Sequence, residues 1–287
     1  MVEARIGVIG GSGLYQISGL SDLRETRVPT PFGEPSDLIV TGTLQGIPMA
    51  FLPRHGRGHQ ASPGELPARA NIFALKSLGV ERIVSVSAVG SLREDLHPLD
   101  LVIPDQIIDR TRGRASTFFG RGLVAHIGFA DPFCPHLSRI LCETAERLGT
   151  PARRGGTCVV IEGPAFSTKA ESHLYRSWGA SIVGMTALPE AKLAREAEIC
   201  YATLAFVTDY DCWHESAEPV CVEMVVANLQ QNAETAKNIV RAAIEEAAGE
   251  RACGCGSALK DAIITSRQHI PAAIKKELAP LVRKYVE

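Results

Sequence analysis

The chain has 287 residues, which is enough for one large α/β domain or for two small ones. Because 45% of the residues are hydrophobic and 22% are charged, the chain can bury a sizeable core. The net charge of -2 argues against nucleic acid as a bulk partner, and no apolar run is long enough to cross a membrane.

The N-terminal segment bears on both location and ligand. The run Ile6-Gly-Val-Ile-Gly-Gly-Ser-Gly13 breaks up the apolar core that a signal peptide needs, so we expect a cytoplasmic protein. A strand over residues 5–9 followed by this glycine turn would present backbone N–H groups to an anion, with Ser12 as a further donor. The turn lacks the Gly-Lys-Ser/Thr of a P-loop and the third glycine of a dinucleotide fingerprint. A purely structural tight turn fits this segment about equally well.

A second anion signal follows a predicted β-hairpin, whose strands are 37–44 and 47–52. The next residues, Pro53-Arg-His-Gly-Arg-Gly-His59, place two arginines and two histidines in a glycine-bearing loop. Arg54 is suited to donate a pair of hydrogen bonds to phosphate oxygens. His55 and His59 have the spacing of a zinc pair on a helix, but this loop is not a helix and offers no third ligand. A solvated basic loop is the alternative interpretation.

The remaining sequence alternates between strands and helices, which predicts one α/β domain. Further strands are expected at 82–86, 101–108, 157–161 and 181–185. Helices are expected at 68–78, 135–148, 169–178, from 186–190 onward, at 222–248 and at 270–286. Residues 111–131 form a long irregular segment, and such loops in compact domains usually serve a site or an interface.

The stretch 201–213 carries the strongest functional signal. Residues 201–207 are apolar with little polar alternation, which is typical of a strand covered on both faces. Asp209 and Asp211 follow at once, and burying two carboxylates without a task is costly. If the extended geometry continues, both point to the same side, beyond the carboxyl end of the strand where ligands of α/β sheets bind. We expect the pair to contact a ligand. An acidic turn that caps the next helix is the alternative interpretation.

Four other predicted strand ends carry polar residues suited to anions or alcohols. They are Ser12, Arg54 with His55, Ser87 with Ala88, and Thr186. Together with the aspartates they indicate a phosphate or phosphate-ester site beside a group recognised by carboxylates.

Eight cysteines are more than we expect for a reducing cytosol. Six of them are scattered and are interpreted as small apolar core residues. Cys253 and Cys255 form a Cys-Gly-Cys without a second pair at zinc-ribbon spacing, so a metal is only weakly indicated. In a hyperthermophile these two would be candidates for disulfides.

Seven short motifs occur in the order found in one enzyme family. They are Gly10-Gly-Ser-Gly13, Arg54-His-Gly-Arg57, Ser87-Ala-Val-Gly-Ser-Leu-Arg93, Asp105-Gln-Ile-Ile-Asp-Arg110, Ile161-Glu-Gly-Pro164, Met185-Thr186 and Thr208-Asp-Tyr-Asp-Cys-Trp213. Through them, residues 5–249 resemble the 5'-methylthioadenosine phosphorylases, a branch of the trimeric purine nucleoside phosphorylase family. The resemblance implies a single nucleoside phosphorylase domain over 1–287, built on a central mixed β-sheet flanked by helices. A C-terminal extension starts at about residue 250.

The resemblance also implies roles for individual residues. Phosphate is held by Ser12, Arg54, His55, Ser87, Ala88 through its backbone N–H, and Thr186. The nucleoside is held by Phe166, Ser167, Met185, Asp209, Asp211, Val222, Val225 and, from a neighbouring subunit, His126. In this arrangement Phe166 stacks on the purine, Met185 lies against the ribose, Asp209 meets N7 and Asp211 meets the exocyclic amine, while the valines surround the 5'-methylthio group.

The implied reaction is phosphorolysis of a nucleoside, in which phosphate attacks C1' as the C1'–N9 bond breaks. Inorganic phosphate is then a co-substrate, and no cofactor, metal, nucleic acid or membrane is expected. The implied assembly is a homotrimer or a dimer of trimers. The nearest alternative is a purine nucleoside phosphorylase acting on adenosine, inosine or methylthioinosine. A nucleoside sensor on the same fold and a nucleoside hydrolase are weaker alternatives.

Overall fold

The computed structural model describes residues 4–11, 13–214 and 222–286. Within the helix that starts at Val222, the side chains of 222–227, 229 and 230 also lie outside the described set. No helix in these described ranges is both long and apolar enough to cross a membrane.

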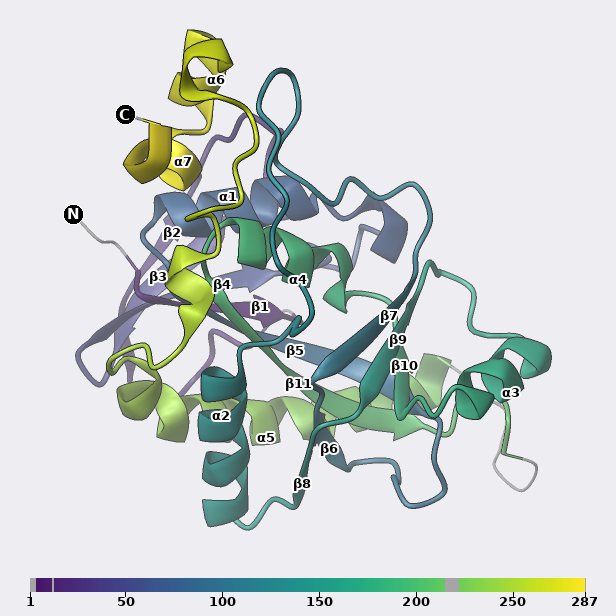
Figure 1. Cartoon of the computed structure of the whole chain (residues 1–287). Coiled ribbons are helices and arrows are strands. Elements are labelled where there is room, and N and C mark those ends of the chain that lie inside the picture. Colours follow the sequence, from purple (N-terminus) through teal and green to yellow (C-terminus); the bar gives the residue numbers. More distant parts are fainter. Residues whose placement is uncertain (1–3, 12, 215–221, 287) are drawn as a thin grey trace.

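A mixed eleven-stranded sheet forms the centre of the molecule (Figure 1). Its main path runs β2 (Leu20–Thr26), β3 (Ile39–Leu44), β4 (Ile47–Pro53), β1 (Ile6–Gly10), β5 (Arg82–Ser91), β10 (Ile182–Gly184), β9 (Thr157–Ile161) and β7 (Gln106–Arg110). A second path leaves β5 through β11 (Cys200–Asp209), β6 (Leu101–Ile103) and β8 (Ala152–Arg154). The sheet therefore branches at β5, which pairs with β1, β10 and β11.

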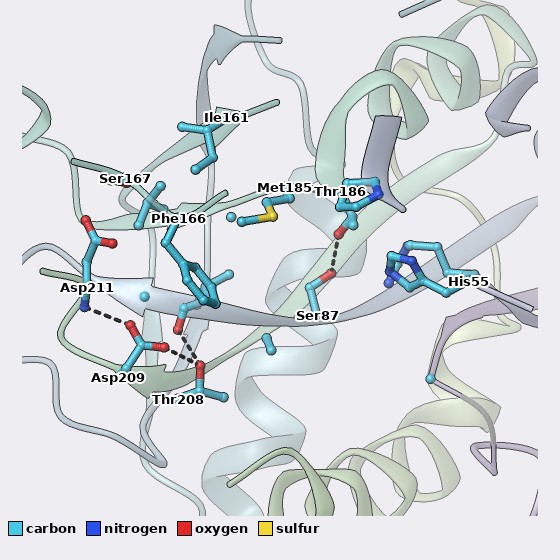
Figure 2. Close-up of a pocket in the computed structure, with 18 of the residues that line it drawn as sticks. His55, Ser87, Ile161, Phe166, Ser167, Met185, Thr186, Thr208, Asp209 and Asp211 are labelled. Atoms are coloured by element: carbon cyan, nitrogen blue, oxygen red, sulfur yellow. Dashed lines mark hydrogen bonds between the residues drawn. The ribbon is translucent and has the colours of Figure 1, made fainter. Parts of the chain in front are cut away.

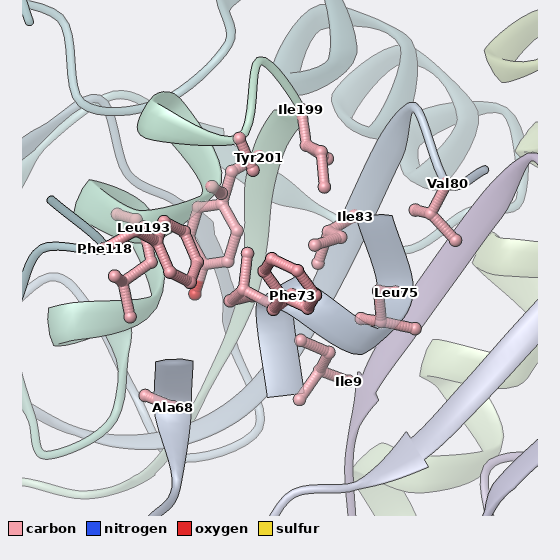
Figure 3. Close-up of a cluster of buried hydrophobic side chains, with 14 of the residues drawn as sticks. Ile9, Ala68, Phe73, Leu75, Val80, Ile83, Phe118, Leu193, Ile199 and Tyr201 are labelled. Atoms are coloured by element: carbon pink, nitrogen blue, oxygen red, sulfur yellow. The ribbon is translucent and has the colours of Figure 1, made fainter. Parts of the chain in front are cut away.

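Helices cover both faces of this sheet (Figure 1). On one side α1 (Ala68–Ser77) packs against α4 (Ala187–Glu196), and on the other α2 (Pro135–Arg147) packs against α5 (Val222–Ala247). The shorter helix α3 (Lys169–Ser177) follows β9, and α6 (Ala272–Glu277) and α7 (Ala279–Val286) end the chain. Two buried apolar clusters correspond to the two faces. Figure 3 shows the one beneath α1 and α4, where Phe73, Leu193 and Tyr201 meet.

Most predicted elements are confirmed. The hairpin of β3 and β4 forms around residues 45 and 46, and every residue of β11 is buried, as its apolar run indicated. Strands β2 and β8 were not predicted; β2 is largely exposed and polar, so it lacks the apolar signal of a core strand. The fold class predicted from the sequence, a central mixed sheet flanked by helices, is confirmed.

Three boundaries were wrong. The expected strand 101–108 is two strands, β6 and β7, separated by Pro104, which lacks a backbone N–H for a ladder. The expected helix 270–286 is two helices, because α6 ends at Glu277 with Leu278 as its C-cap, and α7 starts at Ala279. The strand expected to stop at residue 86 runs on to Ser91, because its small residues pair with β11 as far as Gly90. Ser87 and Ala88 are therefore inside β5 and not beyond its end.

The C-terminal segment is packed onto the body of the molecule. Leu259, Ile270 and Leu281 are buried in the same apolar cluster as β1 and α1. Its backbone also binds the irregular segment 111–131, since His126 N–H donates to the Ala262 carbonyl at 2.8 Å and Ile264 N–H donates to the Val124 carbonyl at 2.9 Å. The segment thus holds the loop that carries His126.

A buried ion pair joins the ends of several elements. Arg54, directly after β4, donates from Nε to Glu190 Oε1 of α4 at 2.6 Å and from Nη2 to Glu190 Oε2 at 3.2 Å. The side chains are only 3% and 2% exposed. Tyr201 Oη of β11 donates to the same carboxylate at 2.9 Å, while Arg54 also donates to the Val86 carbonyl and Ser85 Oγ of β5. One salt bridge therefore fixes β4, β5, β11 and α4 relative to one another.

We predict that Glu190→Gln lowers the free energy of unfolding by about 3–5 kcal/mol, because it leaves the Arg54 charge buried without a counter-ion. The matched control is Lys192→Gln on the same helix, which breaks the partly exposed pair with Asp109 and should change stability by less than about 1 kcal/mol. Urea unfolding of both variants makes the comparison. Equal losses of unfolding free energy in the two variants would show that burial of the Arg54–Glu190 pair does not add to the cost of breaking it.

Candidate active site

A cavity of about 250 Å³ opens where β5, β10 and β11 meet the loops after β4 and β9. Figure 2 shows its two ends. His55, Ser87 and Thr186 lie at one end, and Asp209 and Asp211 lie at the other. The ring of Phe166 and the thioether of Met185 lie between them. The cavity is thus polar at both ends and apolar in the middle.

The end with His55 offers neutral hydrogen-bonding groups. Ser87 Oγ of β5 and Thr186 Oγ1 at the start of α4 lie 3.3 Å apart, and either hydroxyl can be the donor. Hydroxyls in such a pair can both turn outward to donate to one anion. Ala88, next to Ser87, and Gly11 also line this end and bring backbone groups.

His55 is a neutral imidazole in this cavity. Burial, helped by the charges of Arg54 and His59, lowers the pKa of His55 to about 4. Nδ1 lies 2.8 Å from the Ala61 carbonyl, so Nδ1–H donates and Nε2 is left as an acceptor. The ring stacks on His59 with 4.2 Å between centroids. His55 therefore brings no positive charge to the cavity at neutral pH.

Arg54 is the one arginine that lines the described part of the cavity, and its charge is already balanced by Glu190. Four of its five N–H groups face the carboxylate, Ser85 Oγ and the Val86 carbonyl. One Nη1 N–H has no partner in the described residues. The guanidinium can thus give a ligand one hydrogen bond, and the expected two-pronged contact with phosphate does not fit.

The two aspartates lie at the opposite end, but not by the geometry expected from the sequence. The strand β11 ends at Asp209, and Asp211 has a φ of 53°, so the backbone turns instead of staying extended. Asp209 Oδ1 accepts from Asp211 N–H at 2.8 Å and Oδ2 accepts from Thr208 Oγ1 at 2.7 Å. The turn brings both carboxyl groups to the cavity all the same. The structure does not favour a helix cap, because these aspartates line a cavity.

Asp211 Oδ2 is a buried acceptor without a hydrogen-bond partner in the described part of the chain. Burial raises the pKa of Asp211, and the nearby Ser172 and Ser167 hydroxyls oppose the rise only in part. Burial also raises the pKa of Asp209, against the hydrogen bonds from Thr208 and the Asp211 N–H. An unpaired buried carboxylate oxygen costs stability. The arrangement is suited to a ligand that supplies an N–H.

Space for the two aspartates depends on Gly90 in β5. A Cβ at this position would lie 3.0 Å from Asp209 Oδ1 and 3.3 Å from Asp211 Cβ. Gly163 has a similar role in the middle of the cavity, because a Cβ there would lie 2.6 Å from Met185 Sδ. Phe166 is 46% exposed, so its ring leaves an apolar face open to the cavity. Such a face is suited to stacking on an aromatic ligand.

A matching family model has the description Phosphorylase superfamily, and it covers residues 5–245. The chain belongs to this superfamily. Similar proteins named S-methyl-5'-thioadenosine phosphorylase come from Koribacter versatilis, at 57% identity over 99% of this chain and 97% of the relative, and from Geobacter sulfurreducens, at 57% identity over 99% and 100%. Among solved structures, a methylthioadenosine phosphorylase from an antarctic soil metagenomic library is 50% identical, with a TM-score of 0.94 and coverage of 98% and 100%. Methylthioadenosine phosphorylase from Schistosoma mansoni, in complex with adenine, is 34% identical, with a TM-score of 0.81 and coverage of 98% of both chains.

The structure brings most of the predicted site residues of this phosphorylase-superfamily chain to one cavity. Those that line it are Arg54, His55, Ser87, Ala88, Phe166, Ser167, Met185, Thr186, Asp209 and Asp211. Ser12 and the side chains of Val222 and Val225 lie outside the described residues. His126 does not line this cavity; it is exposed on the loop held by the C-terminal segment.

Sequence reasoning missed the residues that support the site. Glu190 was part of an expected helix start, with nothing in its neighbours to mark it as the partner of Arg54. Arg114 lies in the irregular segment 111–131, yet it donates to Glu162, to the Ile161 carbonyl and to the Met185 and Leu188 carbonyls. It thereby joins the loop after β9 to the start of α4. Its only signal was its place in a long loop.

We predict that Asp211→Asn raises the free energy of unfolding at about pH 8 by roughly 1 kcal/mol, while it impairs function. A carboxyl with a raised pKa binds its proton more tightly in the folded state, so it lowers stability as the pH rises above about 4, the unfolded value. The gain should therefore shrink as the pH falls toward about 4. Urea unfolding across this pH range measures it.

The control for this prediction is Asp109→Asn. Burial acts to raise the pKa of Asp109, but hydrogen bonds from Lys192 and Thr111 outweigh it and hold this pKa below its usual range. Removing its charge should therefore lower stability at pH 8, whereas Asp211→Asn should raise it. An Asp211→Asn variant whose stability followed the wild-type pH profile in parallel would contradict a raised pKa at Asp211.

Proposed function

We propose that this chain catalyses the phosphorolysis of S-methyl-5'-thioadenosine to adenine and 5-methylthioribose 1-phosphate, which makes it a pentosyltransferase. The observation that carries the proposal is the buried aspartate pair at one end of a cavity whose other end holds neutral anion donors. The relatives that bear this enzyme name are 50–58% identical, and the four at the top of this range align over nearly their whole length. The enzyme would act as a single nucleoside phosphorylase domain over 1–287, including the extension from about 250.

The proposed ligand positions follow the two ends of the cavity. Phosphate lies against Ser87, Thr186, the Ala88 N–H and the free N–H of Arg54. His55 Nε2 accepts a hydrogen bond from a hydroxyl of the phosphate, which the neutral imidazole of His55 allows. The purine stacks on Phe166 and its exocyclic amine donates to Asp211 Oδ2. Ser12 completes the phosphate site, and Ser167, Met185, Val222 and Val225 complete the nucleoside site.

In the proposed reaction an oxygen of phosphate forms a bond to C1' as the C1'–N9 bond breaks, and the electron pair of that bond stays on the purine. The sugar is cationic in the transition state, so an anion fixed against C1' stabilises it. The leaving purine takes a proton at N7 from the carboxyl group of Asp209, and burial favours the protonated form of this group because it raises the pKa of Asp209. Phosphate is the co-substrate, and the chemistry needs no further cofactor.

The proposed assembly is a cytoplasmic homotrimer, alone or as a dimer of trimers. Its support is the position of His126, which is exposed on a long loop and far enough from its own cavity not to line it. In a trimer this loop would reach the 5' end of a neighbour's nucleoside. Analytical ultracentrifugation that found a fully active monomer would contradict this arrangement.

The alternative is a phosphorylase for 6-oxopurine nucleosides or for adenosine. The aspartate pair disfavours a 6-oxopurine, because the O6 acceptor of hypoxanthine would face Asp211 Oδ2, an acceptor that has no hydrogen-bond partner in the described residues. Against adenosine, a wall of valines would leave the 5'-hydroxyl without a partner, at a cost of about 1–3 kcal/mol. The comparisons with relatives do not favour this alternative.

We predict that the purified protein releases adenine from 5'-methylthioadenosine only in the presence of phosphate. An absorbance assay in phosphate-free and phosphate-containing buffer, with adenosine and inosine as parallel substrates, tests this. Equal release without phosphate would indicate a hydrolase, and no release with any nucleoside would indicate a sensor.

Ser87→Ala should raise the phosphate KM by roughly 10- to 150-fold, the effect of losing a hydrogen bond to a charged group. Ser138→Ala, at a buried serine of α2, is the control and should leave that KM unchanged.

We predict that Asp209→Asn loses most activity on 5'-methylthioadenosine, while the ratio of kcat/KM for inosine to that for adenosine rises. The amide fits without disturbance, because its oxygen can accept from Asp211 N–H and its NH₂ can donate to Thr208 Oγ1, whose proton can turn to the Val89 carbonyl at 3.3 Å. Sites built on one specific hydrogen bond discriminate by up to about 10⁴–10⁵. The ratio is measured at saturating phosphate. If adenine release and the ratio both stay at wild-type values, Asp209 does not contact the base.

A further inference from the structure

Four cysteines from distant parts of the sequence meet in one cluster. The sulfur atoms of Cys134, Cys200, Cys253 and Cys255 all lie within 4.8 Å of one another, and those of Cys200 and Cys253 are 3.4 Å apart. Cys134, Cys200 and Cys255 are buried and Cys253 is partly buried. None of the four is in a disulfide. The cluster lies outside the cavity described above, since none of its members lines that cavity.

Three of the cysteines stand at the start of a structural element, and Cys255 lies inside one. Cys134 is the N-cap of α2, Cys200 is the first residue of β11, and Cys253 is the N-cap of the 3-10 helix η2 (Gly254–Ser257), which contains Cys255. The Cys-Gly-Cys had no second pair at zinc-ribbon spacing in the sequence. Folding supplies that pair from two residues that are far apart in the chain, which sequence spacing cannot reveal.

We infer that these four cysteines form a structural binding site for a single zinc ion. Four thiolates around one Zn²⁺ form a tetrahedron whose edges, for a Zn–S distance of about 2.3 Å, are about 3.8 Å long. Mutual distances up to 4.8 Å, with one of 3.4 Å, need only small side-chain movements to meet this geometry. Two separate disulfides would require each sulfur to approach only one partner. The convergence of all four on a common point is the feature that favours an ion.

The surroundings of the cluster suit a tetrathiolate zinc. Four thiolates and Zn²⁺ leave two negative charges, which need donors and positive charge nearby. The backbone N–H of Leu137, in the first turn of α2, donates to Cys134 Sγ at 3.5 Å, and the helix N-terminus favours negative charge at this position. Thiolates are soft ligands, which select zinc over magnesium or calcium.

A zinc ion at this place would fasten the C-terminal segment to the body of the protein. Residues 253 and 255 lie shortly before the stretch 262–265, whose backbone binds the loop at 124–126. The ion would therefore hold both α2 and the segment that positions the loop with His126. Since structural zinc binding adds directly to folding free energy, its removal should loosen this region.

The test is metal analysis of the full chain, expressed in zinc-supplemented medium and purified under reducing conditions without chelator. We expect close to one zinc per chain. Protein expressed with Co²⁺ instead should show the intense thiolate-to-cobalt charge-transfer bands and the visible d–d bands of a tetrahedral tetrathiolate site. The cobalt spectrum is read from the wild-type chain and does not depend on whether a variant folds.

The variant arm is the double substitution Cys253→Ser with Cys255→Ser, compared with Cys142→Ser, a buried cysteine of α2 outside the cluster. The double variant should lose the zinc and the cobalt bands, and Cys142→Ser should keep both. A chelator strong enough to remove zinc should lower the Tm of the wild type and of Cys142→Ser. Zinc far below one per chain in reduced wild-type protein, absence of tetrathiolate bands, or disulfides mapped among the four cysteines in metal-free protein would each overturn the proposal.

Discussion

The ion pair between Arg54 and Glu190 is the interaction on which the arrangement of the cavity depends. It joins the residue after β4 to α4, and through Tyr201, Ser85 and the Val86 carbonyl it reaches β11 and β5. Hydrogen bonds within the described residues satisfy the Glu190 carboxylate and all but one N–H of the Arg54 guanidinium, and a buried pair depends on such bonds. Ser87 is two residues beyond Ser85 on β5, and Thr186 opens the helix that carries Glu190. The same pair therefore sets the distance between the Ser87 and Thr186 hydroxyls that line the cavity.

The hydrogen bonds of Arg114 fix the other side of the cavity in a similar way. Arg114 connects the loop after β9 with the start of α4 by binding carbonyls on both. Met185 and Thr186 are thus held between two arginines with buried side chains. Most N–H groups of both arginines donate to acceptors of the protein itself. Both arginines are positioning residues for the site. Substitutions at either would change stability as well as substrate affinity, which separates them from Ser87, whose loss should affect phosphate alone.

Much of the fold was predictable because its signals are local. The hairpin of β3 and β4, the buried run of β11 and the helices α1 and α2 each carry their periodicity and their end signals in consecutive residues. The continuation of β5 to Ser91 was not, because a strand of small polar residues is stabilised by its pairing with β11. Likewise the turn at Asp211 depends on the hydrogen bond from its own N–H to Asp209. The line-up of Asp209, Asp211, Ser87 and Thr186 at one cavity was predictable from motifs, whereas Glu190, Arg114 and the role of Gly90 depend on contacts between distant segments.

The charge balance of the cavity bears on how phosphate would act in the proposed reaction. The positive charge of Arg54 is offset by Glu190, and His55 is neutral. A phosphate bound there is held by N–H and O–H dipoles and keeps most of its negative charge. In a site of low dielectric this charge is strongly felt by a cationic C1'. The same negative charge acts on Asp209 and adds to the effect of burial, so that phosphate binding should raise the pKa of Asp209 further. Binding of the nucleophile would thereby favour the protonated carboxyl that the leaving purine needs, and the two ends of the cavity would be coupled through electrostatics without any movement of the backbone.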